Sequence, residues 1–199
     1  QYTNATLIGI TGSNGKTTTA MMTYQILKNA GYDVALAGNI GISFAGEVAQ
    51  KDRQFYVLEI SSFQLDDVQH FAPHIGVITN ITPDHLDRYD FDFSKYLQSK
   101  LRINKNQTHR DFLLFNAADP ELSKAVQNIN SRATIHALGA DSSAANTTHV
   151  QGDQIVIQTQ KNKTMINTME FSLQGRHNLL NAMAASTVAH LLEVSKETI

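Results

Sequence analysis

The feature that most constrains the fold is a regular alternation of short apolar runs with helical stretches, from Thr6 to about Gly139. β-rich apolar runs occupy residues 5–11, 33–39, 54–61, 74–81, 111–116 and 133–138. Helical patterns separate them at residues 16–31, 42–50, 61–71, 92–106 and 120–129. Apolar strands that alternate with helices are typical of a parallel sheet covered on both faces. We therefore predict an α/β fold with a mostly parallel, doubly wound sheet.

The pattern changes after Gly139. Residues 148–171 alternate polar and apolar side chains, with turn signals at Gly152-Asp153 and at 161–163. This alternation predicts a small antiparallel meander, which we expect as an appended sheet within 141–172. Residues 175–194 return to a helical pattern, so the segment 173–199 is expected to end the domain on a helix.

Composition excludes several classes of function. The formal net charge of −2 gives no electrostatic reason to expect a nucleic acid or an anionic membrane as partner. No apolar run reaches the roughly 20 residues that span a bilayer. The absence of cysteine excludes disulfides, thiolate metal sites and thiol catalysis. The 199 residues can bury a sizeable core, and we expect them to be a fragment of a longer, cytoplasmic protein.

The first apolar run leads into the stretch GITGSNGKTTT, which partly matches the phosphate-binding pattern G-x-x-x-x-G-K-[ST]. Gly15, Lys16 and Thr17 fit its end, whereas Ile10 stands where the first glycine belongs and the nearest upstream glycine is Gly12. Backbone N–H groups of this loop could wrap a phosphate, with Lys16 on the terminal phosphates and the Thr17 hydroxyl on Mg²⁺. The alternative is a strand-to-helix turn with an exposed lysine.

Ligands of an open parallel sheet bind beyond the carboxyl ends of its strands. Polar or glycine residues follow each of the first four predicted strands. They are Thr11–Thr17, Gly38-Asn39, Glu59 with Ser61 and Ser62, and Thr82–His85. Because these strand ends meet at one edge of the sheet, their clustering predicts a ligand site there.

Glu59 ends an otherwise apolar strand, and a buried carboxylate is costly unless it is paired or bound to a metal. It could ligate Mg²⁺ beside the phosphates, or it could be an edge glutamate in a salt bridge. His85 could bind a metal or transfer protons, or have no functional role. We expect the neighbouring Asp84, Asp87 and Arg88 to be structural, through capping and pairing.

Four other polar residues allow two interpretations each. Asn39 could hold a left-handed turn or donate to a substrate, and Ser61 could cap a helix or contact a substrate. Asn178 and Asn181 share a helical face and could read a base, or could simply belong to a helix start. From composition alone, Lys100 looks like a solvated helix lysine.

Six motifs, in this order, resemble the Mur ligase family. They are TGSNGKTTT, GNIG, YVLEISSFQL, NITPDHLDRY, SKLRI and GRHNLLNAMAA. The resemblance covers nearly the whole chain and is to the family's central ATP-binding domain. It implies that the N-terminal UDP-binding domain and the C-terminal ligase domain lie outside these residues. The family's T-G-x-N-G-K-[ST] loop matches Thr11–Thr17 throughout, so Ile10 is a family trait.

The resemblance implies roles for individual residues. Lys16 would contact the ATP phosphates, Thr17 and Glu59 would bind a first Mg²⁺, and His85 would bind a second. Lys100 aligns with the lysine that the family carbamylates with CO₂, which reverses the interpretation from composition. A carbamate is a carboxylate-like anion that Mg²⁺ accepts as a ligand. The phosphate-binding residues would be Gly12, Ser13, Asn14, Gly15, Lys16, Thr17 and Thr18.

The same resemblance implies an activity. LEISSFQL together with DHLDRY is most similar to the members of the family that add D-glutamate to UDP-N-acetylmuramoyl-L-alanine. Asn39 and Ser61 would then contact the muramoyl-alanine end, and Asn178 and Asn181 would lie near adenine. ATP would drive amide formation through an acyl phosphate, with Lys16, His85 and Lys100 as the catalytic residues. The expected setting is the bacterial cytoplasm, with a monomeric enzyme and no nucleic-acid or membrane partner.

Three alternatives remain open. The chain could belong to another Mur ligase or to a ligase similar to folylpolyglutamate synthase, although SSFQL argues against both. It could be an ATP-binding module that is inactive without its flanking domains. A phosphate-loop kinase would need an acceptor site and a lid that the sequence does not reveal.

Overall fold

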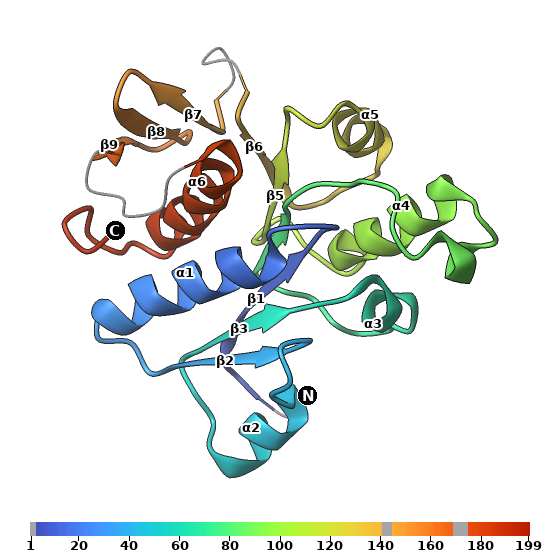
Figure 1. The fold of residues 1–199 in the computed structure, drawn as a ribbon. Coiled ribbons are helices and arrows are strands. Elements are labelled where there is room, and N and C mark those ends of the chain that lie inside the picture. Colours follow the sequence, from blue (N-terminus) through green and yellow to red (C-terminus); the bar gives the residue numbers. More distant parts are fainter. Residues whose placement is uncertain (1–2, 141–144, 169–174) are drawn as a thin grey trace.

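The computed structural model describes residues 3–140, 145–168 and 175–199. Its strands form one nine-stranded sheet in the order β2-β3-β1-β4-β5-β6-β7-β8-β9 (Figure 1). Their bounds are β1 Thr6–Thr11, β2 Val34–Gly38, β3 Phe55–Glu59, β4 Ile75–Ile78, β5 Phe112–Asn116, β6 Thr134–Leu138, β7 Thr147–Gln151, β8 Gln154–Gln158 and β9 Lys163–Asn167. In this order, each neighbouring pair from β2 through β1 to β7 is parallel, which confirms the predicted fold class.

Six α-helices and two short 3₁₀ helices connect or follow the described strands. Their bounds are α1 Lys16–Asn29, α2 Phe44–Gln50, α3 Ser62–Asp66, η1 Leu86–Tyr89, α4 Phe93–Leu101, η2 Arg102–Asn104, α5 Pro120–Asn128 and α6 Arg176–Leu191. None of the helices within the described ranges is long and apolar enough to cross a bilayer.

Two apolar layers hold the helices to the sheet. On one face, α1 and α6 lie side by side and pack on Ile8, Ile10 and Val77, together with further strand residues (Figure 1). On the other face, α3, α4 and α5 pack on a second cluster that includes Leu58 and Leu113. Because both faces are covered, the strands are apolar along most of their length.

The strand order places the site beside β1. The chain moves from β1 outward to β2, returns to β3, and then crosses to β4 on the other side of β1. In such sheets the crevice at this switch point is the usual ligand site. The register aligns the strand ends there, because Glu59 lies opposite both Ile10 and Gly38, and Thr11 lies opposite Ile78.

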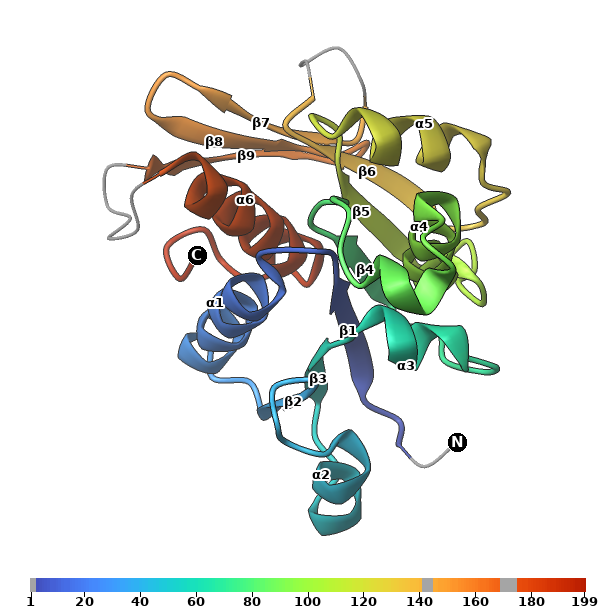
Figure 2. The ribbon, with the colours of Figure 1, turned by 45° about the vertical axis from the view of Figure 1, so that its right-hand side comes forward.

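The antiparallel meander is confirmed, and it is appended to the main sheet as a direct continuation of it. β7 pairs in parallel with β6 through Ala137↔Thr147 and Leu138↔Thr148, and β8 and β9 then add antiparallel strands. Figure 2 shows the three strands continuing the sheet above α6. Ala182 and Met183 of α6 pack on β8 and β9, so one helix covers both parts of the sheet. Residues 141–144 and 169–174 of the expected segments lie outside the described residues.

The helix expected over residues 61–71 is shorter than predicted. α3 ends at Asp66, where the N–H groups of Asp67 and Val68 both turn back to the Leu65 carbonyl. Arg102 donates Nε to the Leu65 carbonyl at 2.8 Å and Nη2 to the Val68 carbonyl at 3.3 Å. Contacts with a distant segment thus hold the chain where the helix ends, and such contacts leave no local sequence signal.

Candidate active site at the carboxyl end of the sheet

The loop between β1 and α1 has the geometry of an anion-binding turn. Gly12 (φ 144°) and Gly15 (φ 83°) adopt backbone conformations that side-chain-bearing residues rarely tolerate. Gly15 precedes the first residue of α1, and no side chain caps that helix. The first N–H groups of α1 are therefore available to a ligand, and a helix N-terminus favours an anion.

Close packing explains why the two glycines stand where they do. A Cβ on Gly12 would overlap the Thr79 hydroxyl, and a Cβ on Gly15 would lie 2.5 Å from Asn181 Oδ1. The loop thus needs its first glycine at the third position before Gly15, against β4. This contact is the physical reason for the displaced glycine in the sequence motif.

The residues after β4 hold the loop in place. The Asn14 backbone N–H donates to Asn80 Oδ1 at 2.9 Å, and Asn80 Nδ2 donates back to the Asn14 carbonyl at 2.9 Å. Ser13 lies deeper, where its hydroxyl bonds to the Thr82 backbone and to the Tyr96 hydroxyl. Sequence reasoning missed Asn80 because the predicted strand, 74–81, ran past it, whereas β4 ends at Ile78.

Two lysine side chains converge on one carbonyl of this loop. Lys16 Nζ donates to the Gly12 carbonyl at 3.0 Å and to the Ser13 carbonyl at 2.9 Å. Lys100 Nζ, from α4, donates to the same Gly12 carbonyl at 2.9 Å. Two cations at one point create a strong local preference for an anion.

Lys100 is a buried lysine, so its interpretation from composition as a solvated residue was wrong. Its exposed fraction is 2%. Burial, and secondarily the positive charge of Lys16, lowers the pKa of Lys100 from 10.5 to about 7. A large fraction of its amine is therefore neutral near physiological pH and can act as a nucleophile.

Glu59 is buried at the end of β3 with neutral partners only. Its exposed fraction is 3%. Its Oε2 accepts from the Thr17 hydroxyl at 2.6 Å and its Oε1 from Asn39 Nδ2 at 2.9 Å. In the described part of the chain no cation pairs with it, which argues against the salt-bridge alternative. β3 also lies between β2 and β1, so Glu59 is not on an edge strand.

The set of donors at Glu59 fits a hard divalent cation. A carboxylate and a hydroxyl are the oxygen ligands that Mg²⁺ prefers, and Mg²⁺ usually keeps several waters and binds substrate phosphates. Thr17 lies in the first turn of α1, next to the phosphate loop. Among the residues that the structure describes, no group of three histidines and carboxylates forms a metal cage. A metal here would therefore need further ligands from water or a bound phosphate.

His85 lies in the loop before η1 with a strained backbone. It has φ 49°, and its side chain is 59% exposed. Its Nε2 lies 3.7 Å from Asp84 Oδ2, and its ring contacts Phe63 edge-on. Arg88 lies over the same Phe63 ring, and in the described residues it is not paired with Asp87. The metal-binding role of His85 stays a prediction.

Ser61 is a helix cap, and Asn39 is a partner of Glu59. The Ser61 hydroxyl accepts from the Gln64 N–H, and Gln64 Oε1 accepts from the Ser61 N–H, which forms a capping box on α3. The Asn39 backbone N–H also donates to the Glu59 carbonyl at 2.9 Å. Both residues lie at the predicted edge of the sheet, and their contacts with a substrate stay predictions.

A small cavity of about 70 Å³ continues from the phosphate loop toward α6. It is lined by Asn14, Gly15, Thr79, Asn80, Asn116, Leu138, His177, Leu180, Asn181 and Ala184. Asn181 Oδ1 accepts from the Thr19 hydroxyl at 3.2 Å, so this asparagine links α6 to α1. Asn116 was missed, although it ends β5 and obeys the same strand-end rule. Asn178 lies in the first turn of the same helix but does not line this cavity.

Comparisons with known proteins agree with this geometry. The Mur ligase middle domain model matches residues 10–189. A UDP-N-acetylmuramoylalanine--D-glutamate ligase of Christiangramia forsetii is 41% identical over 198 residues, covering 100% of this chain and 44% of that protein. The protein of the same name from Bacteroides fragilis is 42% identical over 199 residues, covering 100% and 45%. The chain thus spans less than half the length of these curated relatives.

Solved structures show the same fold at lower identity. A UDP-N-acetylmuramoyl-L-alanyl-D-glutamate--2,6-diaminopimelate ligase is 19% identical with a TM-score of 0.72, and the match covers 98% of this chain and 45% of that one. A MurF ligase of Thermotoga maritima, solved in complex with ADP, is 19% identical with a TM-score of 0.68, covering 98% and 48%. With the family model matched over most of the chain, this protein belongs to the Mur ligase middle domain family.

Proposed function

We propose that this chain is the ATP-binding part of an amide ligase that adds D-glutamate to UDP-N-acetylmuramoyl-L-alanine in peptidoglycan precursor synthesis. The observation that carries the proposal is the convergence of Lys16 and Lys100 on the Gly12 carbonyl, beside the buried Glu59–Thr17 pair. The names of the curated relatives supply the substrates.

The loop and α1 would bind the ATP phosphates. Free N–H groups at the start of α1 would face the phosphate oxygens, and Lys16 would turn from its loop carbonyls onto them. Adenine would occupy the cavity between the loop and α6, where Asn181 offers an amide and Leu180 an apolar surface. Asn178 would lie near the same base.

Glu59 and Thr17 would hold a first Mg²⁺, and His85 would hold a second with the carbamate that CO₂ forms on Lys100. The low pKa of Lys100 supports this modification, because only a neutral amine attacks CO₂. When bound, the metal ions would neutralise charge on the transferring phosphoryl group.

The reaction needs no enzyme nucleophile. The L-alanine carboxylate of the substrate would attack the γ-phosphate of ATP, which gives an acyl phosphate and ADP. The amine of D-glutamate would then attack the acyl carbon, and phosphate would leave as the amide forms. The contribution of this chain is positioning and electrostatic stabilisation, through Lys16 and the aligned strand ends. Asn39 and Ser61 would orient the muramoyl-alanine end.

An amino-acid panel on the full-length enzyme tests the substrate. We expect ADP release with UDP-N-acetylmuramoyl-L-alanine to be fastest with D-glutamate. Faster release with L-lysine or diaminopimelate would assign another ligase of the family.

A second test addresses the part played by this chain. The 199-residue chain alone should bind ATP weakly and form no amide, because it spans less than half of its relatives. Amide formation by the isolated chain would refute the assignment of the remaining functions to other domains.

A further inference from the structure

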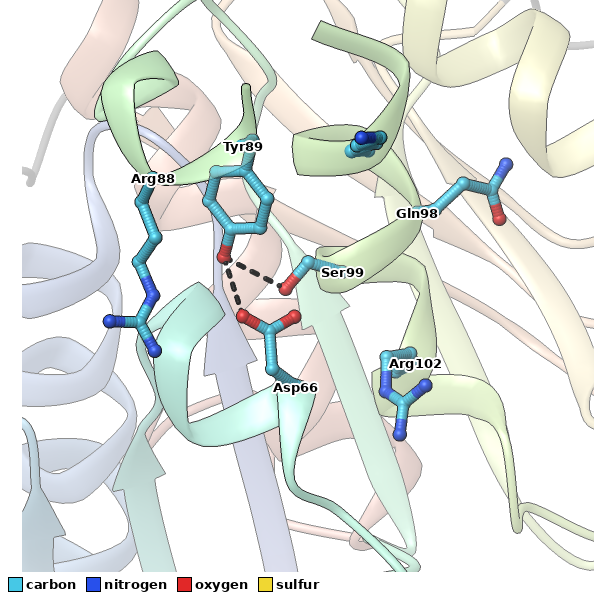
Figure 3. A pocket seen from close by; sticks show the side chains of 7 residues that line it. Asp66, Arg88, Tyr89, Gln98, Ser99 and Arg102 are labelled. Atoms are coloured by element: carbon cyan, nitrogen blue, oxygen red, sulfur yellow. Dashed lines mark hydrogen bonds between the residues drawn. The ribbon is translucent and has the colours of Figure 1, made fainter. Parts of the chain in front are cut away.

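A second, larger pocket of about 580 Å³ lies between α3, η1 and α4 (Figure 3). It is lined by Asp66, Arg88, Tyr89, Lys95, Gln98, Ser99 and Arg102. It shares no residue with the phosphate loop, the Glu59–Thr17 pair or the cavity beside α6. Its volume falls within the range of small-molecule sites, roughly 300–1,000 Å³, but its lining is mainly polar and charged. Such a lining suits a small charged ligand.

The Asp66 carboxylate is held in place yet keeps one oxygen unoccupied. The Tyr89 hydroxyl donates to Asp66 Oδ2 at 2.9 Å and also approaches Ser99 Oγ at 3.2 Å. Ser99 in turn donates to the Ser62 carbonyl at 2.8 Å, so this side of the pocket is fixed by hydrogen bonds. In the described ranges no hydrogen bond or ion pair engages Asp66 Oδ1.

Two guanidinium groups flank this carboxylate without pairing with it. Arg88 lies over the Phe63 ring, 4.4 Å from its centroid. Arg102 donates Nε to the Leu65 carbonyl of α3 and Nη2 to the Val68 carbonyl just after it, which leaves its Nη1 available. Figure 3 shows Asp66 between the two arginines in this view. The remaining cation, Lys95, is already bonded to Asp90 at 2.6 Å.

We propose that this pocket binds a free acidic amino acid, with the ligand ammonium on Asp66 and its two carboxylates on Arg88 and Arg102. Two guanidinium groups and one carboxylate are the charge complement of two carboxylates and one ammonium. Guanidinium–carboxylate pairs are also among the stronger hydrogen-bonded contacts in proteins. The proposal is independent of the amino acid that the ligase consumes and of where that substrate binds.

The pocket is open to solvent, and this determines the affinity expected for an acidic amino acid and the selectivity between its enantiomers. Exposed ion pairs contribute little, so the affinity should be in the millimolar range, about 4 kcal/mol of binding free energy. Because the pocket is open to solvent, the D- and L-enantiomers should bind within about threefold of each other. A substrate site of a ligase would discriminate more strongly between them.

The experiment is a chemical-shift titration of the ¹⁵N-labelled 199-residue chain with D-glutamate, L-glutamate, glutarate and 4-aminobutyrate. Saturable shifts are expected for both glutamates at amides of residues 86–102. Glutarate lacks the ammonium and 4-aminobutyrate lacks one carboxylate, so each should bind about threefold to tenfold more weakly. Glutarate binding as tightly as glutamate would overturn the role of Asp66, and no saturable shift in this segment would overturn the site.

Paired variants separate a specific site from general charge effects. Asp66→Asn keeps an acceptor for Tyr89 and Arg88→Gln keeps a polar side chain, so both should retain the native spectrum while glutamate binding weakens. Asp153→Asn and Lys161→Gln make the same charge changes in the exposed turns of the meander and should not alter binding. Equal weakening by all four variants would refute the site. ATP binding measured on the same samples tests the proposed function separately.

Discussion

Lys16 and Lys100 lie 84 positions apart in the sequence, yet their ammonium groups donate to the same Gly12 carbonyl, at 3.0 and 2.9 Å. Neither lysine forms an ion pair with a carboxylate in the described part of the chain. Their mutual repulsion and the burial of Lys100 are costs that an anion between them would relieve. Without an anion, the domain therefore holds two close positive charges, which lower its stability but favour the binding of an anion.

The first prediction separates stability from ligand binding at Lys100. Lys100→Met removes a buried cation and keeps the chain length, so the unfolding free energy at pH 6.5 should rise by about 1–3 kcal/mol. Phosphate-ligand affinity should fall, because one of the two converging charges is lost. Urea unfolding and ATP titration measure the two effects. Lys95→Met, an exposed change in the same helix, should not raise stability, and a destabilised Lys100→Met would contradict the prediction.

The second prediction concerns the metal role of Glu59. Glu59→Gln keeps an oxygen that accepts from Asn39 and turns its amide NH2 to the Thr17 hydroxyl, but it removes the anionic ligand. The domain should remain folded, while the enhancement of ATP affinity by Mg²⁺ should drop by about tenfold, or 1.4 kcal/mol. Calorimetric ATP titrations with and without Mg²⁺ give this ratio. Glu121→Gln, at an exposed position of α5, is the control, and an unchanged Mg²⁺ effect in Glu59→Gln would exclude Glu59 as a ligand.

The third prediction tests why the loop glycine is displaced. Gly12→Ala forces a Cβ onto the Thr79 hydroxyl at φ 144° and should destabilise the chain by about 2–4 kcal/mol. Gly31→Ala also has a positive φ, 84°, but open space around it, so it should cost only about 1 kcal/mol. Chemical denaturation of the two variants compares them. Equal costs would mean that backbone conformation alone, without the Thr79 contact, accounts for Gly12.

Sequence reasoning located the strand-end part of the site because parallel strands bring their carboxyl ends to one edge. Glu59, Asn39 and the phosphate loop meet there for that reason. The same rule applied to the fifth strand would have found Asn116. Lys100 was different, because its helix carries both exposed and buried positions and only its packing against the loop decides its burial. Family resemblance, not periodicity, identified it.

Two features of the fold had no local signal. The end of α3 is held by Arg102, which lies in another element and donates to the Leu65 carbonyl. The continuity of the meander with the main sheet depends on the pairing of β6 with β7. Alternating patterns identify a strand but do not say which neighbour it will pair with.

The last prediction concerns a buried histidine between the sheet and α6. His136 Nε2 lies 2.8 Å from Thr148 Oγ1, which is 2.7 Å from Thr187 Oγ1. Burial lowers the pKa of His136 to about 4, with a smaller effect from the charge of His190. Thr187 completes the chain by donating to the Met183 carbonyl at 2.6 Å. A neutral imidazole is therefore part of the contact that holds α6 on the sheet.

The folded state resists protonation of His136, whereas the unfolded chain takes up a proton near pH 6.5. The contribution of the neutral His136 to the unfolding free energy is thus fully present above pH 6.5. It is lost as pH falls from 6.5 toward 4, by about 2–3 kcal/mol in total. His136→Gln keeps a polar side chain that does not titrate, so its unfolding free energy should fall less between pH 7.5 and 4.5. Urea unfolding at the two pH values for both proteins measures the difference. Parallel losses in the two proteins would show that other groups cause the acid sensitivity.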